Sequence, residues 1–370
     1  MRMNKELRVL LVGQNSPILH GQSIQYAALL GGSQSWSGIH VEALNTVYAE
    51  SRDALSSFSL RKLFRMVAYA GRMYWKAHRQ KTDIIVLSLA FHKGPFLKDS
   101  LFILLAKYVC RAQVIGWIHM DPNRLDWDRQ PRWFQKYASW VVSKMDRLVS
   151  CAPSLSANWP EWLLRTAVVS VPNGVKDEGV GFSRKREGSC RVGYLSSMDP
   201  EKGWRELFAA ALKMCDQDSD IEFHFYGGLG SGDSQKAIEK QFADQPFGKR
   251  IVWHGATWGE NKSRAYQEMD LYCFPSHTEA FPLSVLEAMS FSLPIVSTDV
   301  GAIKDAMVSD QGGWYCKPGD EESLLLVLSQ ALESQNQWLK MGEYNRKRYL
   351  EDFSSEVFVE CWHDLLLHGE

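Results

Sequence analysis

Residues 271–305, LYCFPSHTEAFPLSVLEAMSFSLPIVSTDVGAIKD, decide the fold class of this chain. The segment contains an apolar run at 271–274, a helical pattern at 284–291 and a second apolar run at 294–297. Short apolar runs that flank one helix are typical of a βαβ unit. The segment therefore predicts an α/β fold with a parallel sheet.

Two carboxylates lie in this segment, with seven residues between them. Glu279 lies in the loop before the helix, and Glu287 lies about one turn inside the helix. In open α/β sheets, ligands bind at the carboxyl ends of the strands, so we expect both acids to face that edge. Carboxylates accept hydrogen bonds from sugar or ribose hydroxyls and repel phosphate. The alternative is that Glu279 is solvated and that Glu287 caps or pairs locally.

The helix in this segment begins just after Phe281 and Pro282. Near Leu283, Ser284 and Val285, the first backbone N–H groups have no partner within the helix. Such a helix start is a binding site for a phosphate group. The segment therefore predicts an anion site with two hydroxyl-binding acids beside it.

The segment resembles the donor-binding signature of the retaining glycosyltransferases of family 4, which combines an E-x7-E motif, an LEAM helix and an LPIVSTDVG strand. The resemblance covers the second half of the chain well and the first half by position. It implies the GT-B architecture, in which two Rossmann-like, doubly wound parallel-sheet domains face a cleft. The matching residues are Glu279, Phe281, Pro282, Leu283, Leu286, Glu287, Ala288, Met289, Pro294, Ile295, Val296, Asp299 and Gly301.

The resemblance also implies a division of the chain. We expect an acceptor-side domain at 1–175, a linker at 176–188, a nucleotide-sugar-binding domain at 189–350 and a last helix at 351–370 that packs back toward the first domain. Val171-Pro172-Asn173-Gly174-Val175 matches the hinge sequence of the family. Apolar runs predict further strands at 7–12, 84–89, 114–118, 146–151, 167–172, 191–195, 221–226 and 251–254.

A loop after the first strand of the second half carries Lys202, just before a helix. A lysine ammonium at this position is well placed to neutralise a diphosphate. The family usually has an arginine six residues earlier, where this chain has Ser196. Arg205 is a candidate substitute for the missing charge.

The first half offers two further candidates. Gly21 lies in a turn-rich loop after the first strand, where the family places a glycine that faces the donor diphosphate; a plain tight turn is the alternative. His119 follows a predicted strand, and the resemblance implies that it orients the donor sugar from the opposite domain. Asp126-Trp127-Asp128 has the form of a D-x-D metal motif, but we interpret it as a solvated loop.

The resemblance implies a metal-independent enzyme of the hexosyltransferase type that takes a UDP- or GDP-linked sugar and needs no separate cofactor. Glu279 would hold the donor sugar near the reacting carbon, Glu287 would hold the ribose, and Lys202 with the helix start would hold the diphosphate. Closure of the two domains would exclude water. The acceptor would be a carbohydrate or a lipid-linked molecule, as in bacterial surface polysaccharide or glycolipid synthesis.

Three other functions remain open at this stage. Paired carboxylates also occur in glycosidases, although a phosphate-binding helix start beside them argues against that class. A sugar-nucleotide epimerase shares the fold. A catalytically silent partner that binds sugar nucleotide is the third, and Ser196 in place of arginine keeps it open.

The near-neutral net charge of −1 conceals an asymmetry. Residues 1–180 hold 23 Lys/Arg against 13 Asp/Glu, and the remainder holds 19 against 30. Residues 60–81 have seven Lys/Arg and no acid, with Leu60, Leu63, Phe64, Val67, Tyr74 and Trp75 at helical spacing. This pattern is typical of a helix at an anionic membrane surface, and packing of its apolar face on the sheet is the alternative. Binding to nucleic acid is a competing interpretation of this positive charge, but the sequence contains no nucleic-acid recognition module.

Cysteine spacing and hydropathy indicate in which cellular compartment we expect the protein. The seven cysteines are scattered without a C-x-x-C pair, which argues against a disulfide framework or a zinc site. The first apolar run is too short for a secretory signal, and no apolar stretch is long enough to span a membrane. We therefore expect a cytoplasmic protein, peripheral at the inner face of the membrane.

Overall fold

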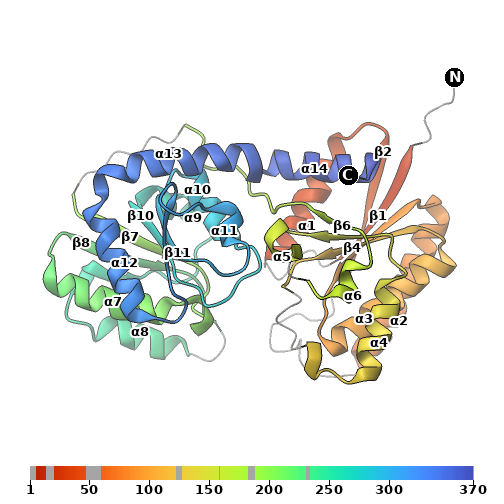
Figure 1. The fold of residues 1–370 in the computed structure, drawn as a ribbon, viewed down its shortest axis with the longest axis horizontal. Coiled ribbons are helices and arrows are strands. Elements are labelled where there is room, and N and C mark those ends of the chain that lie inside the picture. The colour runs from red at the N-terminus through yellow and green to blue at the C-terminus, as the bar shows by residue number, and fades with distance from the viewer. Residues whose placement is uncertain are drawn as a thin grey trace. The chain divides into compact units, whose positions relative to one another are not determined.

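The structure, a computed structural model, describes residues 6–13, 21–46, 60–121, 127–157, 159–181, 188–230 and 234–369. The chain divides into two compact units, one of residues 1–174 and 355–370 and one of residues 175–354. Each unit contains a six-stranded parallel sheet with helices against it (Figure 1). The expected α/β fold with two doubly wound sheets is thereby confirmed.

The first sheet has the strand order β2-β1-β3-β4-β5-β6, and every pair in it is parallel. The chain order reverses between β1 and β3, so this sheet has one switch point. The elements of the first unit are β1 (Leu7–Gly13), α1 (Gly21–Gly32), η1 (Ser33–Ser35), β2 (Ile39–Asn45), α2 (Leu60–Gln80), β3 (Ile84–Leu89), α3 (Lys93–Leu104), η3 (Leu105–Val109), β4 (Gln113–Ile118), η5 (Trp127–Arg129), α4 (Arg132–Val142), β5 (Arg147–Ser150), α5 (Pro153–Ala157), α6 (Glu161–Leu164), β6 (Val168–Ser170) and α14 (Ser355–His368).

Alternate residues of the first sheet enter two separate cores. Leu10 and Val12 of β1 belong to the core under α2, α3 and α4, whereas Val9 and Leu11 belong to the core under α1 and α14. Figure 1 shows α2, α3 and α4 together on one side of this sheet. Because successive side chains of a strand point to opposite faces, a strand buried on both faces is apolar throughout.

Helix α2 directs several of its large apolar side chains away from the sheet. Ala70, Met73 and Ala77 are buried in the core, whereas Phe64 and Trp75 are exposed. Packing of the apolar face on the sheet, one of the two expectations for this helix, is therefore wrong for Phe64 and Trp75. Residues 14–20 of the first loop and Asp126 of the D-x-D motif lie outside the described residues. The same holds for the side chains of Leu60, Leu63 and Asp128.

The second sheet has the strand order β12-β11-β10-β7-β8-β9, again entirely parallel. The elements of the second unit are β7 (Cys190–Leu195), η6 (Pro200–Lys202), α7 (Trp204–Gln217), β8 (Ile221–Tyr226), α8 (Gln235–Ala243), η7 (Gly248–Arg250), β9 (Ile251–Trp253), α9 (Glu260–Glu268), β10 (Leu271–Phe274), α10 (Leu283–Ser290), β11 (Ile295–Thr298), α11 (Ile303–Ala306), β12 (Gly313–Cys316), α12 (Glu321–Glu333), η8 (Gln335–Gln337), α13 (Trp338–Arg348) and η9 (Tyr349–Phe353).

The chain order of this sheet reverses between β7 and β10, which are hydrogen-bonded neighbours. From β7 the chain moves outward to β8 and β9, and from β10 it moves the other way to β11 and β12. The loops after β7 and β10 therefore begin side by side at the carboxyl edge, and the chain continues from them in opposite directions. This switch point is where open α/β sheets bind ligands.

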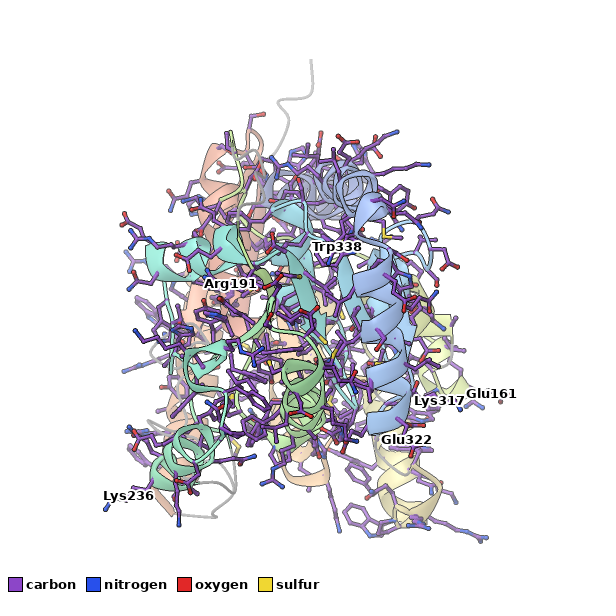
Figure 2. All side chains as sticks on the ribbon, turned by 90° about the vertical axis from the view of Figure 1, so that its left-hand side faces the viewer. Glu161, Arg191, Lys236, Lys317, Glu322 and Trp338 are labelled. Atoms are coloured by element: carbon purple, nitrogen blue, oxygen red, sulfur yellow. The ribbon has the colours of Figure 1, made fainter. Side chains whose placement is uncertain are left out.

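A cluster of titratable side chains lies across β7, β8 and β9. His224 Nδ1 lies 2.9 Å from His254 Nε2, and His224 Nε2 lies 3.1 Å from a carboxylate oxygen of Glu222. The guanidinium of Arg191, labelled in Figure 2, forms an ion pair with the same carboxylate at 3.4 Å. Burial lowers the pKa of His224 to about 4, and the charges of Arg191 and His254 act in the same direction, against the opposing effect of Glu222.

This cluster makes stability depend on pH. The unfolded chain binds a proton on His224 near its usual pKa of about 6.5, whereas the folded protein binds it only near 4, so stability is expected to fall as pH falls through that window. Between pH 7 and pH 5 the expected loss is about 2 kcal/mol. Urea unfolding at both pH values should show a smaller loss in His224→Gln than in the wild type. The exposed His40 supplies the control His40→Gln, and an identical pH dependence in wild type and His224→Gln would contradict the assignment.

Candidate functional site

The loops after β7 and β10 contact each other directly at the switch point of the second sheet. The backbone N–H of His277 donates to the carbonyl of Glu201 at 2.8 Å, and Ser276 Oγ lies 3.1 Å from the same carbonyl. Thr298 Oγ1, at the end of β11, donates to the carbonyl of Ser276 at 2.6 Å. These hydrogen bonds connect the loop after β7, the loop after β10 and the end of β11. We call this connected group the rim.

Two glycines allow this close approach. Gly203 has a φ of +75°, and a Cβ there would lie 2.0 Å from the carbonyl oxygen of Pro275. Gly301 has a φ of +59°, and a Cβ there would lie 2.4 Å from the carbonyl oxygen of Glu279. A left-handed backbone without a side chain is available at low cost only to glycine. Gly203 therefore lets the loops after β7 and β10 approach each other, and Gly301 does the same for the loops after β10 and β11.

The rim brings together two residues predicted separately. Lys202 Nζ lies 2.6 Å from Glu279 Oε1, and Ser276 Oγ donates to the same carboxylate oxygen at 2.9 Å. The Glu279 side chain is 9% exposed and that of Lys202 is 27% exposed, so the carboxylate is nearly buried and the lysine side chain reaches the surface. A charge-assisted bond of this kind fixes both groups before any ligand arrives.

The helix that follows Glu279 presents an uncapped N-terminus. Helix α10 begins at Leu283 with Pro282 at the N-cap, and proline offers no side-chain acceptor for the first N–H groups. The first turn of α10 carries no acidic side chain. The N–H groups of the first turn, near Ser284 and Val285, therefore have no side-chain cap, and the anion site that the sequence predicts there stays a prediction.

Glu287 is held by two residues that the sequence analysis did not single out. Lys262 Nζ pairs with one carboxylate oxygen, and Tyr266 Oη lies 2.9 Å from the other. Lys262 and Tyr266 are four residues apart on α9, so they share a face of that helix. Burial raises the pKa of Tyr266 well above its usual value, which keeps the hydroxyl protonated as a donor. A carboxylate fixed at both oxygens still has lone pairs to accept ligand hydroxyls.

The remaining candidates of the second unit occupy different surroundings. Phe281 is buried and packs edge-on against Phe353 at 5.7 Å, so its ring supports the loop from within. Ser196 is half-buried, and its backbone N–H donates to the carbonyl of Tyr226. Arg205 is exposed, with its guanidinium 5.5 Å from the indole of Trp204.

Two candidates belong to the first unit. Gly21 is exposed and begins α1. His119 directly follows β4, with its ring 4.3 Å from that of Trp117 in the core. Among the residues that the structure describes, no group of three or more His, Cys, Asp or Glu side chains is arranged to hold a metal ion.

The geometry of the second unit coincides with a match to a known family. The family model described as Glycosyl transferases group 1 matches residues 176–348. This part of the chain, which contains Lys202, Glu279 and Glu287, is therefore similar to the group 1 glycosyltransferases. The match supports glycosyltransferase activity for the chain.

Curated relatives agree with this class. An uncharacterised glycosyltransferase of Haemophilus influenzae is 24% identical over 72% of this chain and 73% of its own length. The sulfoquinovosyl transferase of Arabidopsis thaliana is 36% identical over 27% of this chain and 19% of its own length. The capsular polysaccharide biosynthesis glycosyltransferase CapM of Staphylococcus aureus is 22% identical over 46% of this chain and 43% of its own length.

Solved structures match nearly the whole chain. A glycosyltransferase from Rickettsia africae has a TM-score of 0.76 at 14% identity and covers 99% of this chain and 100% of its own. Anabaena HepE, crystallised in complex with UDP, has a TM-score of 0.72 at 13% identity and covers 97% of this chain and 99% of its own. These similarities show that both units share the GT-B fold of known glycosyltransferases.

Proposed function

We propose that this protein is a retaining glycosyltransferase of family 4 that transfers a sugar from a UDP- or GDP-linked donor to an acceptor hydroxyl without a metal ion. The observation that carries the proposal is the Lys202–Glu279 pair, 2.6 Å apart, next to the N-terminus of α10. A lysine, a carboxylate and a helix start without a side-chain cap thus lie at the switch point of a sheet whose family match is to glycosyltransferases, and this supports the proposal.

The diphosphate is proposed to bind between the ammonium of Lys202 and the N–H groups that begin α10. Both are positive, and both are in place before the donor arrives, so they stabilise the charge that develops as the nucleotide diphosphate leaves. Ser196 replaces the arginine that the family usually has, which leaves Lys202 as the fixed cation of its loop. Loss of Lys202 should therefore be costly.

The two acids are proposed to hold different hydroxyls. Glu279 already accepts hydrogen bonds from Lys202 and Ser276, so its second oxygen is the available acceptor for the donor sugar. Glu287 lies one turn into α10, where Lys262 and Tyr266 hold it, and it would accept the ribose hydroxyls. His119 is proposed to orient the sugar from the first unit, and Gly21 to approach the diphosphate.

The donor class and the pathway are also proposals. The structure of Anabaena HepE in complex with UDP-glucose supports a nucleotide-sugar donor. Relatives named for capsular polysaccharide biosynthesis and for phosphatidyl-myo-inositol mannosyl transfer support an acceptor in surface polysaccharide or glycolipid synthesis. We propose that the protein works at the inner face of a membrane, where such acceptors are found. Within the described parts of the chain, no helix combines the length and apolarity needed to cross a bilayer.

Incubation of the purified protein with a panel of UDP- and GDP-sugars, with and without membrane extract, tests this function. Release of nucleoside diphosphate that depends on the acceptor, with the anomeric configuration of the donor retained in the product, is the expected result. Isomerised donor would identify an epimerase instead. Nucleotide binding without turnover across the panel would identify a silent binding partner, and either result would overturn the proposal.

A further inference from the structure

The outer surface of α2, α3, η3 and α4 in the first unit exposes a concentration of large apolar side chains. Of the eighteen large apolar side chains that are exposed among the described residues, ten lie on these four neighbouring elements. Their inner faces pack on the sheet through other residues, such as Met73 and Phe96. The exposed groups therefore contribute nothing to the core that these helices cover.

The exposed groups form a stripe on each helix. On α2, Phe64 is 76% exposed and Trp75 is 57% exposed, and they are eleven residues, or about three turns, apart. On α4, Trp133 and Trp140 are 55% and 46% exposed and seven residues apart. Leu97 and Leu101 are exposed four residues apart on α3, the helix that contacts both α2 and α4. Contiguous apolar surface of this kind marks an interaction site.

The charge on these helices is almost entirely positive. The elements α2, η3 and α4 have no acidic residue, and the one acid of α3, Asp99, is buried and accepts a hydrogen bond from the backbone N–H of Ala90. Cationic groups lie over the exposed indoles: Arg79 over Trp75 at 5.0 Å and Lys93 over Trp133 at 5.0 Å. The stripes are thus interleaved with cations rather than surrounded by a mixed polar rim.

We propose that this three-helix surface, formed by α2, α3 with η3, and α4, docks on a bilayer that contains anionic phospholipid. Indole rings sit at the headgroup level of membranes, and long basic side chains extend along apolar surface to reach lipid phosphates. Apposed copies of this surface would bring like charges together, which disfavours self-association. Lysine is also depleted from protein–protein interfaces. The inference rests on the proposed membrane location and names the surface that provides it.

Co-sedimentation of the full chain with vesicles tests the proposal. Vesicles of phosphatidylcholine mixed with phosphatidylglycerol should bind the protein, and vesicles of phosphatidylcholine alone should bind it much more weakly. The double variants Trp133→Ala/Trp140→Ala and Arg72→Ala/Arg79→Ala should each reduce the partition coefficient roughly tenfold or more. The double variant Leu326→Ala/Leu339→Ala, in exposed residues of α12 and α13, is the matched control and should bind like the wild type.

Urea midpoints of all variants establish that they are folded. Wild-type binding by both surface variants, or equal binding to neutral and anionic vesicles, would overturn the inference. A change of oligomeric state in light scattering without loss of vesicle binding would assign the surface to a second copy instead. Vesicle binding by a protein that turns over no sugar nucleotide would refute the transferase proposal alone, and transfer activity in a protein that does not bind anionic vesicles would refute this inference alone.

Discussion

Replacement of Lys202 or Glu279 by alanine is expected to lower kcat at least about tenfold in steady-state transfer assays. Lys202→Ala removes the fixed cation of the diphosphate site and leaves the nearly buried Glu279 without its partner. Glu279→Ala removes the proposed acceptor for the donor sugar. Because the two side chains act as one bonded pair, the double variant should cost much less than the product of the single effects.

The control for this prediction lies on the next helix of the same unit. Lys213 is on α7, is half exposed and pairs with Glu321, so Lys213→Ala removes a lysine ion pair away from the switch point. Its kcat should equal that of the wild type, and all variants should keep the wild-type urea midpoint within experimental error. Wild-type turnover in both Lys202→Ala and Glu279→Ala would contradict the proposed site.

Trp362→Ala is expected to destabilise the first unit by about 3–5 kcal/mol, the usual cost of deleting a buried tryptophan side chain. Trp362 is fully buried on α14 and packs edge-on against Trp117 of β4 at 4.8 Å. Phe358, one turn earlier on α14, belongs to the same core. The loss would leave a cavity between this helix and the sheet, which equilibrium urea unfolding monitored by tryptophan fluorescence and circular dichroism should detect.

The same helix supplies the control. Leu367 is 43% exposed, so Leu367→Ala removes little buried surface and should change the free energy of unfolding by less than about 1 kcal/mol. Equal destabilisation by the two substitutions would show that α14 is not anchored through its tryptophan.

Most of the central strands could be predicted from the sequence because they are buried on both faces. The apolar runs at 84–89 and 271–274 coincide with β3 and β10, residue for residue. The strands that the pattern did not reveal, β2 and β12, are edge strands of the two sheets. Five of the seven residues of β2 are partly or largely exposed, so β2 presents no long apolar run, and the four residues of β12 begin with a glycine that follows the polar stretch SDQG.

The residues of the candidate site also fall into two groups, those that could be predicted from the sequence and those that could not. Glu279, Glu287 and Lys202 could be named from local motifs, because each lies next to a strand end or a helix start. Lys262 and Tyr266 could not, since α9 has no motif and its contact with Glu287 depends on how two helices pack.

The sequence alone determined most of the strands, the uncapped start of α10 and the excess of positive charge in the first half, because these follow from burial patterns and residue types that are local in the chain. Only the tertiary structure decided that Lys202 and Glu279, 77 residues apart, form an ion pair, because the neighbours β7 and β10 meet through sheet topology. It also decided which face of α2 is exposed: a helix buries one face against a sheet, Ala70 and Met73 lie on that face, and Phe64 therefore remains in solvent.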